Sequence, residues 1–336
     1  MTADQYLHGI LLREAVDAGP NSPLLGVQTI LMPVLRQWAG DNLLGVYPSG
    51  SFMKGTAVRS GTDIDLFLSL SENTTETLKE VYNQLFDCLT SAGYSPRRQN
   101  VSLNIKVTSG AKAPIFSASG GTAGSRALSN PDPVDGTAGR GSGKSPKQIP
   151  RRPEALLGMT KIRTFDGTAG SRALSKGMAS SYSVDLVPGK RQNALADDHS
   201  LYRRKADTWT KTNVLTHART VIGAGRADEI RIVKLWRNQK GLDFPSFYLE
   251  LSVIRALAAK PLPGLLTYRA QPTLAQRVMM VFDYLRDSIA AARIADPANS
   301  NNIISDDLTA REKAKVSTAA KAARQAAASS WEDIVR

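Results

Sequence analysis

The sequence is poor in the side chains that form disulfides or bind transition metals. It has one cysteine, Cys88, and three histidines, His8, His199 and His217, which lie far apart along the chain. One cysteine excludes a disulfide framework and a cysteine-based zinc site, and histidines so widely separated do not form a metal-binding motif. Side chains that bear oxygen are therefore the remaining candidates for metal ligands.

Long hydrophobic runs are missing as well. No apolar stretch approaches the roughly 18 residues that a membrane-spanning helix needs, and the N-terminus does not show the basic and then apolar pattern of a secretion signal. Hydrophobic residues make up 42% and charged residues 22% of the chain, as in ordinary globular proteins. We expect a soluble, cytoplasmic protein with no membrane partner.

Positive charge exceeds negative charge, with 43 Lys and Arg against 30 Asp and Glu, a formal net charge of +13. This balance favours polyanionic partners such as nucleotides or nucleic acid. Much of the excess, +7, falls in residues 109–180, which also hold 12 of the 26 glycines and 6 of the 17 prolines. Such a composition predicts a flexible basic insertion. Whether this insertion binds RNA or DNA stays open.

The rest of the chain has clear apolar periodicity. A short apolar run predicts a strand at 43–47, and alternation predicts strands at 63–70, 101–107 and 182–187. Helical spacing predicts helices at 24–38, 75–92, 201–222, 227–239, 245–258, 272–293 and 306–329. A mixed sheet followed by helices indicates an α+β fold. We expect the strands at 101–107 and 182–187 to pair as antiparallel neighbours, with the insertion leaving from their tip. Trp209, Trp236 and Trp331 are expected in the core.

Two carboxylates stand out on the second predicted strand. Asp63 and Asp65 are two residues apart, so their side chains point to the same side of the strand. A solvated strand edge would explain this pair equally well. However, Gly50 and Ser51 precede them at the end of the first strand, where backbone N–H groups and a hydroxyl can approach a phosphate. Together, these residues predict a triphosphate-binding loop beside a metal-binding pair.

Two-metal phosphoryl transfer needs a further carboxylate from a neighbouring strand, and Mg²⁺ prefers carboxylate and phosphate oxygens. Asp185 meets this need, because it lies in the last predicted strand between Val184 and Leu186, which face the core. A surface acid at a strand end is the alternative interpretation of Asp185.

These motifs have a recognisable counterpart. Gly50-Ser51, Asp63-Ile64-Asp65-Leu66 and Val184-Asp185-Leu186-Val187-Pro188 resemble the signature of polymerase-beta-type nucleotidyltransferases. More narrowly, they resemble the branch that contains cyclic GMP-AMP synthase, oligoadenylate synthase and the bacterial CD-NTases. The resemblance covers about 1–108 and 181–336. It implies an α+β fold, with a mixed-sheet nucleotidyltransferase core at 1–197, interrupted by the insertion at about 109–180, and a helical domain at 198–336 that closes the nucleotide cleft.

The resemblance also implies an activity. With two Mg²⁺ ions, or Mn²⁺ as an alternative, the enzyme would join nucleoside triphosphates into a cyclic or linear oligonucleotide and release pyrophosphate. Asp63 and Asp65 would bridge both metals, and Asp185 would bind the catalytic metal. In a bacterial CD-NTase, the product is a second messenger for a downstream antiphage effector, which makes such an effector a further expected partner.

Nucleotide contacts are implied at five positions. Gly50 and Ser51 would hold the β- and γ-phosphates, assisted by Lys234 and Ser246, and Phe247 would stack on the base. Phe247 stands where relatives often have tyrosine, so a phenolic hydroxyl is missing there. Other interpretations stay open: Lys234 as a solvated lysine, Ser246 as a helix cap and Phe247 as a core residue.

Two other functions fit part of the pattern. The first is an RNA 3′-end nucleotidyltransferase, similar to tRNA CCA-adding enzymes or poly(A) polymerases; against it, such enzymes usually carry an additional RNA-gripping domain, which we do not expect after residue 336. The second is a catalytically idle protein that binds RNA or DNA through its basic insertion; the complete set of three acids argues against it. The zinc element of the animal DNA sensor has no counterpart here, so regulation by DNA through that element is not implied.

Overall fold

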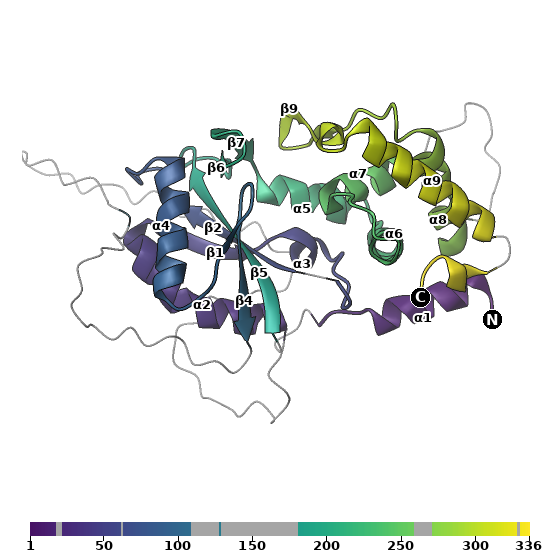
Figure 1. Cartoon of the computed structure of the whole chain (residues 1–336), viewed down its shortest axis with the longest axis horizontal. Coiled ribbons are helices and arrows are strands. Elements are labelled where there is room, and N and C mark those ends of the chain that lie inside the picture. The colour runs from purple at the N-terminus through teal and green to yellow at the C-terminus, as the bar shows by residue number, and fades with distance from the viewer. Residues whose placement is uncertain (18–21, 62, 109–127, 129–180, 259–270, 328–329) are drawn as a thin grey trace, which may run out of the picture. The chain divides into compact units, whose positions relative to one another are not determined.

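The computed structural model describes residues 1–17, 22–61, 63–108, 128, 181–258, 271–327 and 330–336 (Figure 1). The helices in these ranges are α1 (Ala3–Arg13), α2 (Pro23–Ala39), α3 (Gly50–Lys54), α4 (Leu78–Ser91), α5 (Val214–Gly223), α6 (Ala227–Gln239), α7 (Ser246–Leu257), α8 (Leu274–Asp287) and α9 (Ala310–Ala326). The strands are β1 (Leu43–Pro48), β2 (Ile64–Leu70), β3 (Arg97–Arg98), β4 (Leu103–Thr108), β5 (Ser181–Arg191), β6 (His199–Arg203), β7 (Thr208–Thr212), β8 (Ala295–Asp296) and β9 (Asn299–Ile303). This content confirms the predicted α+β class.

The main sheet is mixed, as the sequence predicted. Its strand order is β1-β2-β5-β4-β3, with β6 pairing with β5 and β7 pairing with β6. The β2–β5 pair is parallel, while β1–β2 and β4–β5 are antiparallel. The expected antiparallel pairing of the strands that flank the insertion is confirmed, with Thr108 opposite Ser181 at the end of the ladder.

Recurrent capping motifs set the starts of four helices. In each case the threonine hydroxyl oxygen accepts a hydrogen bond from the backbone N–H three residues later, and the Glu or Gln side chain at that position accepts one from the threonine N–H. The pairs are Thr2 and Gln5 at α1, Thr77 and Glu80 at α4, Thr273 and Gln276 at α8, and Thr309 and Glu312 at α9. Each cap of this kind stabilises its helix by about 1 kcal/mol.

Two hydrophobic cores hold the described elements together. The first lies between the sheet and helices α2 and α4, where Trp38, Leu66 and Tyr82 are almost completely buried. The second joins α1 to α6, α7, α8 and α9 around Trp236 and Phe282, whose rings lie edge to face. The N-terminal helix α1 thus packs with the later helices, and the division into domains at residue 197 stays a prediction.

The segment expected as one helix at 201–222 is different in the structure. Strands β6 and β7 form a hairpin before α5 begins at Val214, and Asp207 in the turn has a positive φ of 46°. The sequence Thr-Trp-Thr-Lys-Thr of β7 explains this, because β-branched and aromatic residues favour strands. Trp209 on β7 is 56% exposed, so its predicted core position was wrong, whereas Trp236 and Trp331 are buried as predicted.

The last two predicted helices are shorter than expected. The helix predicted at 272–293 ends at Asp287 and is followed by the β8–β9 hairpin, and the helix predicted at 306–329 begins only at Ala310, after the cap at Thr309. Among the helices in the described ranges, none combines the length and the apolar character needed to cross a membrane.

The insertion touches the first core at one described point. Within 109–180, only residue 128 belongs to the described part of the chain. Leu128 is 7% exposed, and its N–H donates to the Trp38 carbonyl at 2.9 Å. The expected course of the remaining insertion lies outside the described residues.

Replacing 110–179 with a short glycine-containing turn should preserve the fold, because Thr108 and Ser181 are already paired. Shortening the loop from about 70 to about 5 residues contributes about 2.3 kcal/mol, and losing the burial of Leu128 costs about 1.5–3 kcal/mol. We therefore expect the free energy of unfolding in urea to stay within about 1 kcal/mol of the full chain. As a control, Leu128→Ala in the full chain should lower it by about 2 kcal/mol or more. Loss of cooperative unfolding in the shortened chain would contradict the prediction.

Candidate active site

The turn between β1 and α3 lies directly against the second predicted acid. Gly50 has a φ of +55°, a conformation that side chains disfavour, and a Cβ placed on it would come within 1.8 Å of Asp65 Oδ2. The Ser49 N–H donates to the Asp65 carbonyl at 2.9 Å and fixes the turn to β2. Both the backbone conformation and the lack of space therefore require glycine at this position. The structure thus brings Gly50 beside Asp65, as the sequence indicated, and Ser51 follows as the second residue of α3.

The parallel pairing of β2 and β5 brings two acids together. Asp65 and Asp185 are direct partners in the register of these strands. Asp63 precedes β2 and is exposed. Its negative charge raises the pKa values of both Asp65 and Asp185, so it lies close enough to act on them. The three predicted acids therefore share one end of the β2–β5 pair.

These acids repel one another in a poorly solvated place. Burial raises the pKa of Asp65 to about 7, with a further contribution from the charge of Asp185, while Lys54 and Lys234 act in the opposite direction. Burial also raises the pKa of Asp185, although hydrogen bonds from Asn104 and Gln99 oppose the rise. The ionised carboxylates of Asp65 and Asp185 are therefore destabilised in the protein alone, as is expected at a site where a cation binds.

A polar side chain on the neighbouring strand orients Asp185. Asn104 is 3% exposed and lies opposite Asp185 in the β4–β5 register. Its Nδ2 donates to Asp185 Oδ1 at 2.7 Å and to Ser183 Oγ at 2.8 Å, and its Oδ1 accepts from Arg97 Nη2 at 2.7 Å. Gln99 Nε2 donates to the same Oδ1 of Asp185 at 3.2 Å. Both bonds use one carboxylate oxygen, so the other, Oδ2, accepts no hydrogen bond from any described residue.

The donor set fits a divalent ion that prefers oxygen. The Asp65 carboxylate accepts no hydrogen bond from any described residue and lies beside a second acid. Within the described ranges, no three His, Cys, Asp or Glu side chains converge closely enough to hold an ion by themselves. Asp63 therefore does not complete a three-carboxylate site with Asp65 and Asp185 in the structure. The in-register pair Asp65 and Asp185 remains, and Mg²⁺ is usually bound by one or two carboxylates together with water and substrate phosphates.

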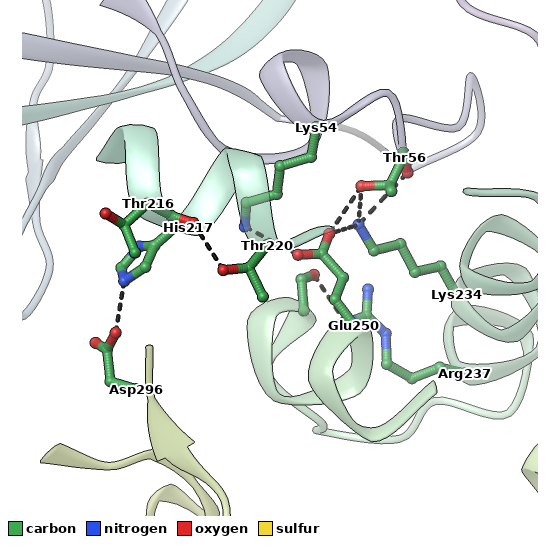
Figure 2. Close-up of polar contacts among 10 residues, drawn as sticks. Lys54, Thr56, Thr216, His217, Thr220, Lys234, Arg237, Glu250 and Asp296 are labelled. Carbon is green, nitrogen blue, oxygen red and sulfur yellow. Dashed lines mark hydrogen bonds and ion pairs between the residues drawn. The ribbon is translucent and has the colours of Figure 1, made fainter. Parts of the chain in front are cut away.

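A buried carboxylate on α7 forms ion pairs with two lysine side chains (Figure 2). Glu250 is 0% exposed, and it binds Lys54 Nζ at 2.9 Å and Lys234 Nζ at 2.6 Å. The Thr56 hydroxyl donates to it at 2.7 Å and accepts from Lys234 at 2.9 Å. Burial alone would raise the pKa of Glu250, but the two ammonium groups hold it below its usual value. Burial lowers the pKa of Lys234, which Glu250 offsets only in part.

The residues on α6 and α7 that were predicted to contact the nucleotide are close to this cluster, but each interacts with another side chain of the protein. Lys234 is 3% exposed and directs its ammonium group to Glu250. Ser246, the first residue of α7, accepts from Arg237 Nη1 at 2.9 Å and makes no capping bond. Phe247 is half-buried, with Lys54 Nζ 4.2 Å from its ring centroid. Their roles toward a nucleotide stay predictions.

A histidine and an aspartate that form a hydrogen bond lie beside Phe247. The His217 ring on α5 lies 4.4 Å from the Phe247 ring, and its Nε2 is 2.7 Å from Asp296 Oδ1 on β8 (Figure 2). Four residues around the site were not identified from the sequence: His217, Asp296, Asn104 and Glu250. Only Glu250 gave a local signal, because it is an acid inside an otherwise apolar stretch of helix.

No protein-family model matches the sequence, and no curated protein matches it. Solved structures do resemble its fold. CdnG, a CD-NTase of Bradyrhizobium diazoefficiens in complex with GTP, aligns with a TM-score of 0.61 and 10% identity over 98% of this chain and 91% of that one. The CdnE cyclic dinucleotide synthase of Elizabethkingia meningoseptica, with GTP and Apcpp, gives 0.55 and 11% identity over 95% and 97%. The Cid1 poly(U) polymerase with MgATP gives 0.51 and 10% identity over 98% and 96%. The predicted nucleotidyltransferase fold and its likeness to CD-NTases are thus confirmed.

The pKa of Asp65 predicts a pH dependence of stability. Because this pKa rises from 3.8 to about 7 on folding, the native state holds the proton more tightly than the unfolded state. Without metal, stability should therefore fall as pH rises from about 4 to about 7 and then level off. Asp65→Asn removes this loss, so the variant should be more stable than wild type at pH 8, by at most about 4 kcal/mol, and similar at pH 4.

Urea unfolding at a series of pH values measures this difference in the free energy of unfolding. Asp87→Asn, which replaces an exposed acid on α4, serves as the matched control. A constant difference between Asp65→Asn and wild type at every pH would contradict the prediction.

Proposed function

We propose that the chain is a metal-dependent nucleotidyltransferase that joins nucleoside triphosphates into a cyclic or linear oligonucleotide and releases pyrophosphate. The observation that carries this proposal is the in-register pair Asp65 and Asp185 beside the Gly50 turn. Phosphoryl transfer by two divalent ions needs acids from adjacent strands next to a place where a triphosphate can approach the backbone closely.

Asp63, Asp65 and Asp185 would hold two Mg²⁺ ions, or Mn²⁺, which when bound supply activation of the attacking hydroxyl and charge stabilisation of the leaving pyrophosphate. Asp65 binds a cation only when it has lost its proton. Because its pKa is raised to about 7, protons compete with the metal near neutral pH. Activity at limiting Mg²⁺ therefore increases as pH rises through 7.

The chain's own residues bind and orient the triphosphate. The Gly50 turn lets the backbone approach the phosphates, with Ser51 as an additional donor. Lys54 and Lys234 share the single carboxylate of Glu250, so the cluster keeps an excess of positive charge close to the turn. Phosphate oxygens can then attract a lysine from Glu250 without creating an unpaired buried anion, because the other lysine remains.

The base is expected beside Phe247. Its ring contacts His217, which Asp296 orients, so the platform is fixed on α5, α7 and β8. A base would take the position of Lys54 above the ring when that lysine moves to the phosphates. Ser246, whose hydroxyl accepts from Arg237, directly precedes this ring in the sequence.

The cellular role follows by analogy with the bacterial CD-NTases. The product would act in the cytoplasm as a second messenger for an antiphage effector. The fold likeness to CdnG and to a cyclic dinucleotide synthase supports this role.

A second candidate, addition of nucleotides to an RNA 3′ end, is favoured by the fold likeness to a poly(U) polymerase. Both reactions use the same acids and differ in the acceptor hydroxyl.

Incubation of the purified chain with labelled nucleoside triphosphates and Mg²⁺ or Mn²⁺, with and without tRNA, separates these functions. We expect small phosphatase-resistant products without RNA. Labelled tRNA would instead establish the RNA-end reaction, and no incorporation under any condition would overturn both. Asp65→Asn and Asp185→Asn should each lower product formation by more than about a hundredfold, since even the loss of a residue that only hydrogen-bonds to a metal ligand costs about 10- to 100-fold. The exposed Asp87→Asn should retain wild-type activity.

A further inference from the structure

A pocket of about 380 Å³ lies between the β6–β7 hairpin and the β8–β9 hairpin. The first hairpin contributes Arg203, Trp209 and Lys211 to its walls, and β9 contributes Asn299 and Asn301. None of these side chains belongs to the acid pair, the Gly50 turn or the Glu250 cluster. The pocket is therefore separate from the residues proposed to bind metal and phosphate, although Asn302 in its wall donates to Asp296, which holds His217 beside Phe247.

Trp209 gives this pocket an aromatic wall that is open to solvent. Its side chain is 56% exposed, whereas Trp38, Trp236 and Trp331 are 2%, 0% and 9% exposed. A tryptophan is rarely left in water to this extent, because its ring is the largest apolar surface among the side chains. An exposed indole is well suited to stacking on a flat aromatic ligand.

Positive charge beside the indole is available to an anion. The Arg203 side chain makes no hydrogen bond or ion pair with any described residue, whereas its backbone carbonyl accepts from the Ala206 N–H. Burial raises the pKa of Asp307, and the charge of Arg203 opposes that rise, which places the guanidinium near this acid. Lys211 pairs with Asp198 at 3.2 Å, with side chains 36% and 27% exposed, and a pair this open contributes little.

The opposite wall carries amides with free hydrogen-bonding groups. Asn299 and Asn301 make no side-chain hydrogen bond within the described ranges, while Asn302 donates to Asp296 at 3.3 Å. An amide offers both donors and an acceptor, the combination that the edge of a nucleobase matches.

We propose that this pocket binds a nucleotide unit of a single-stranded nucleic acid. Trp209 stacks on the base, Arg203 contacts the adjoining phosphate, and Asn299 and Asn301 contact the base edge. A single strand fits better than a duplex because only an unpaired base can expose its face to the indole. Arg203 and Lys211 in the pocket wall attract the phosphates of such a strand, which makes binding dependent on salt.

Tryptophan fluorescence tests the proposal, because Trp209 is far more exposed to solvent than the other three tryptophans. A single-stranded oligouridylate of about 12 nucleotides, within the usual range of such sites, is titrated into the full chain without divalent ions or free nucleotide. We expect saturable quenching of tryptophan emission, because Trp209 dominates the solvent-accessible signal. The omission of metal and nucleotide keeps the result independent of catalysis, so its failure is distinct from failure of the proposed function.

Variants then assign the binding to this pocket, with the anisotropy of a labelled oligouridylate as the measure. Trp209→Ala should weaken binding about ten- to a hundredfold, and Trp209→Phe should retain most of the affinity. Arg203→Ala should weaken binding and reduce the slope of log K against log salt by about one. Lys321→Ala on α9 removes the same charge away from the pocket and should leave the affinity close to wild type.

Three results would overturn the proposal. They are unchanged binding by Trp209→Ala, equal losses in Arg203→Ala and Lys321→Ala, and equally tight binding of a duplex of the same length.

Discussion

The buried carboxylate of Glu250 is the interaction on which the site depends. It is fully enclosed, yet it is satisfied by Lys54, Lys234 and the Thr56 hydroxyl. Breaking one side of such a pair typically costs 3–5 kcal/mol, because it leaves an uncompensated buried charge. The partners come from α3, the turn after it and α6, while Glu250 itself lies on α7. One carboxylate therefore fixes the turn that follows β1 to the helices that carry the predicted nucleotide contacts.

The site places negatively charged acids next to positively charged lysines. The acids at the β2–β5 pair carry a pKa raised by burial and mutual repulsion, and the Lys54 and Lys234 ammonium groups moderate it. In the proposed function, a divalent cation would relieve the repulsion among the acids, and a triphosphate would balance the excess charge of the lysines. A metal–triphosphate complex would therefore neutralise both groups of charges at once.

Local pattern predicted the parts of the site that depend on local geometry. The acids Asp65 and Asp185, the Gly50 turn and the β4–β5 pairing follow from alternation and glycine placement, and the structure contains them. The partner of Lys234 could not be predicted in this way, because which side chains Glu250 meets is decided by the packing of α6 and α7 against a turn almost two hundred residues earlier. The β6–β7 hairpin was missed for a different reason: five residues that alternate also fit a short helical pattern, and tertiary pairing with β5 decides between them.

A crystal structure of the chain with Mn²⁺ and a non-hydrolysable nucleoside triphosphate tests the central claim most directly. The account predicts anomalous density for Mn²⁺ between Asp65 and Asp185, with two ions about 3.5–4 Å apart. It also predicts the triphosphate along the Gly50 turn and at least one of Lys54 and Lys234 moved from Glu250 to a phosphate. Mn²⁺ bound away from both acids, or a triphosphate bound elsewhere with the Glu250 cluster unchanged, would contradict it.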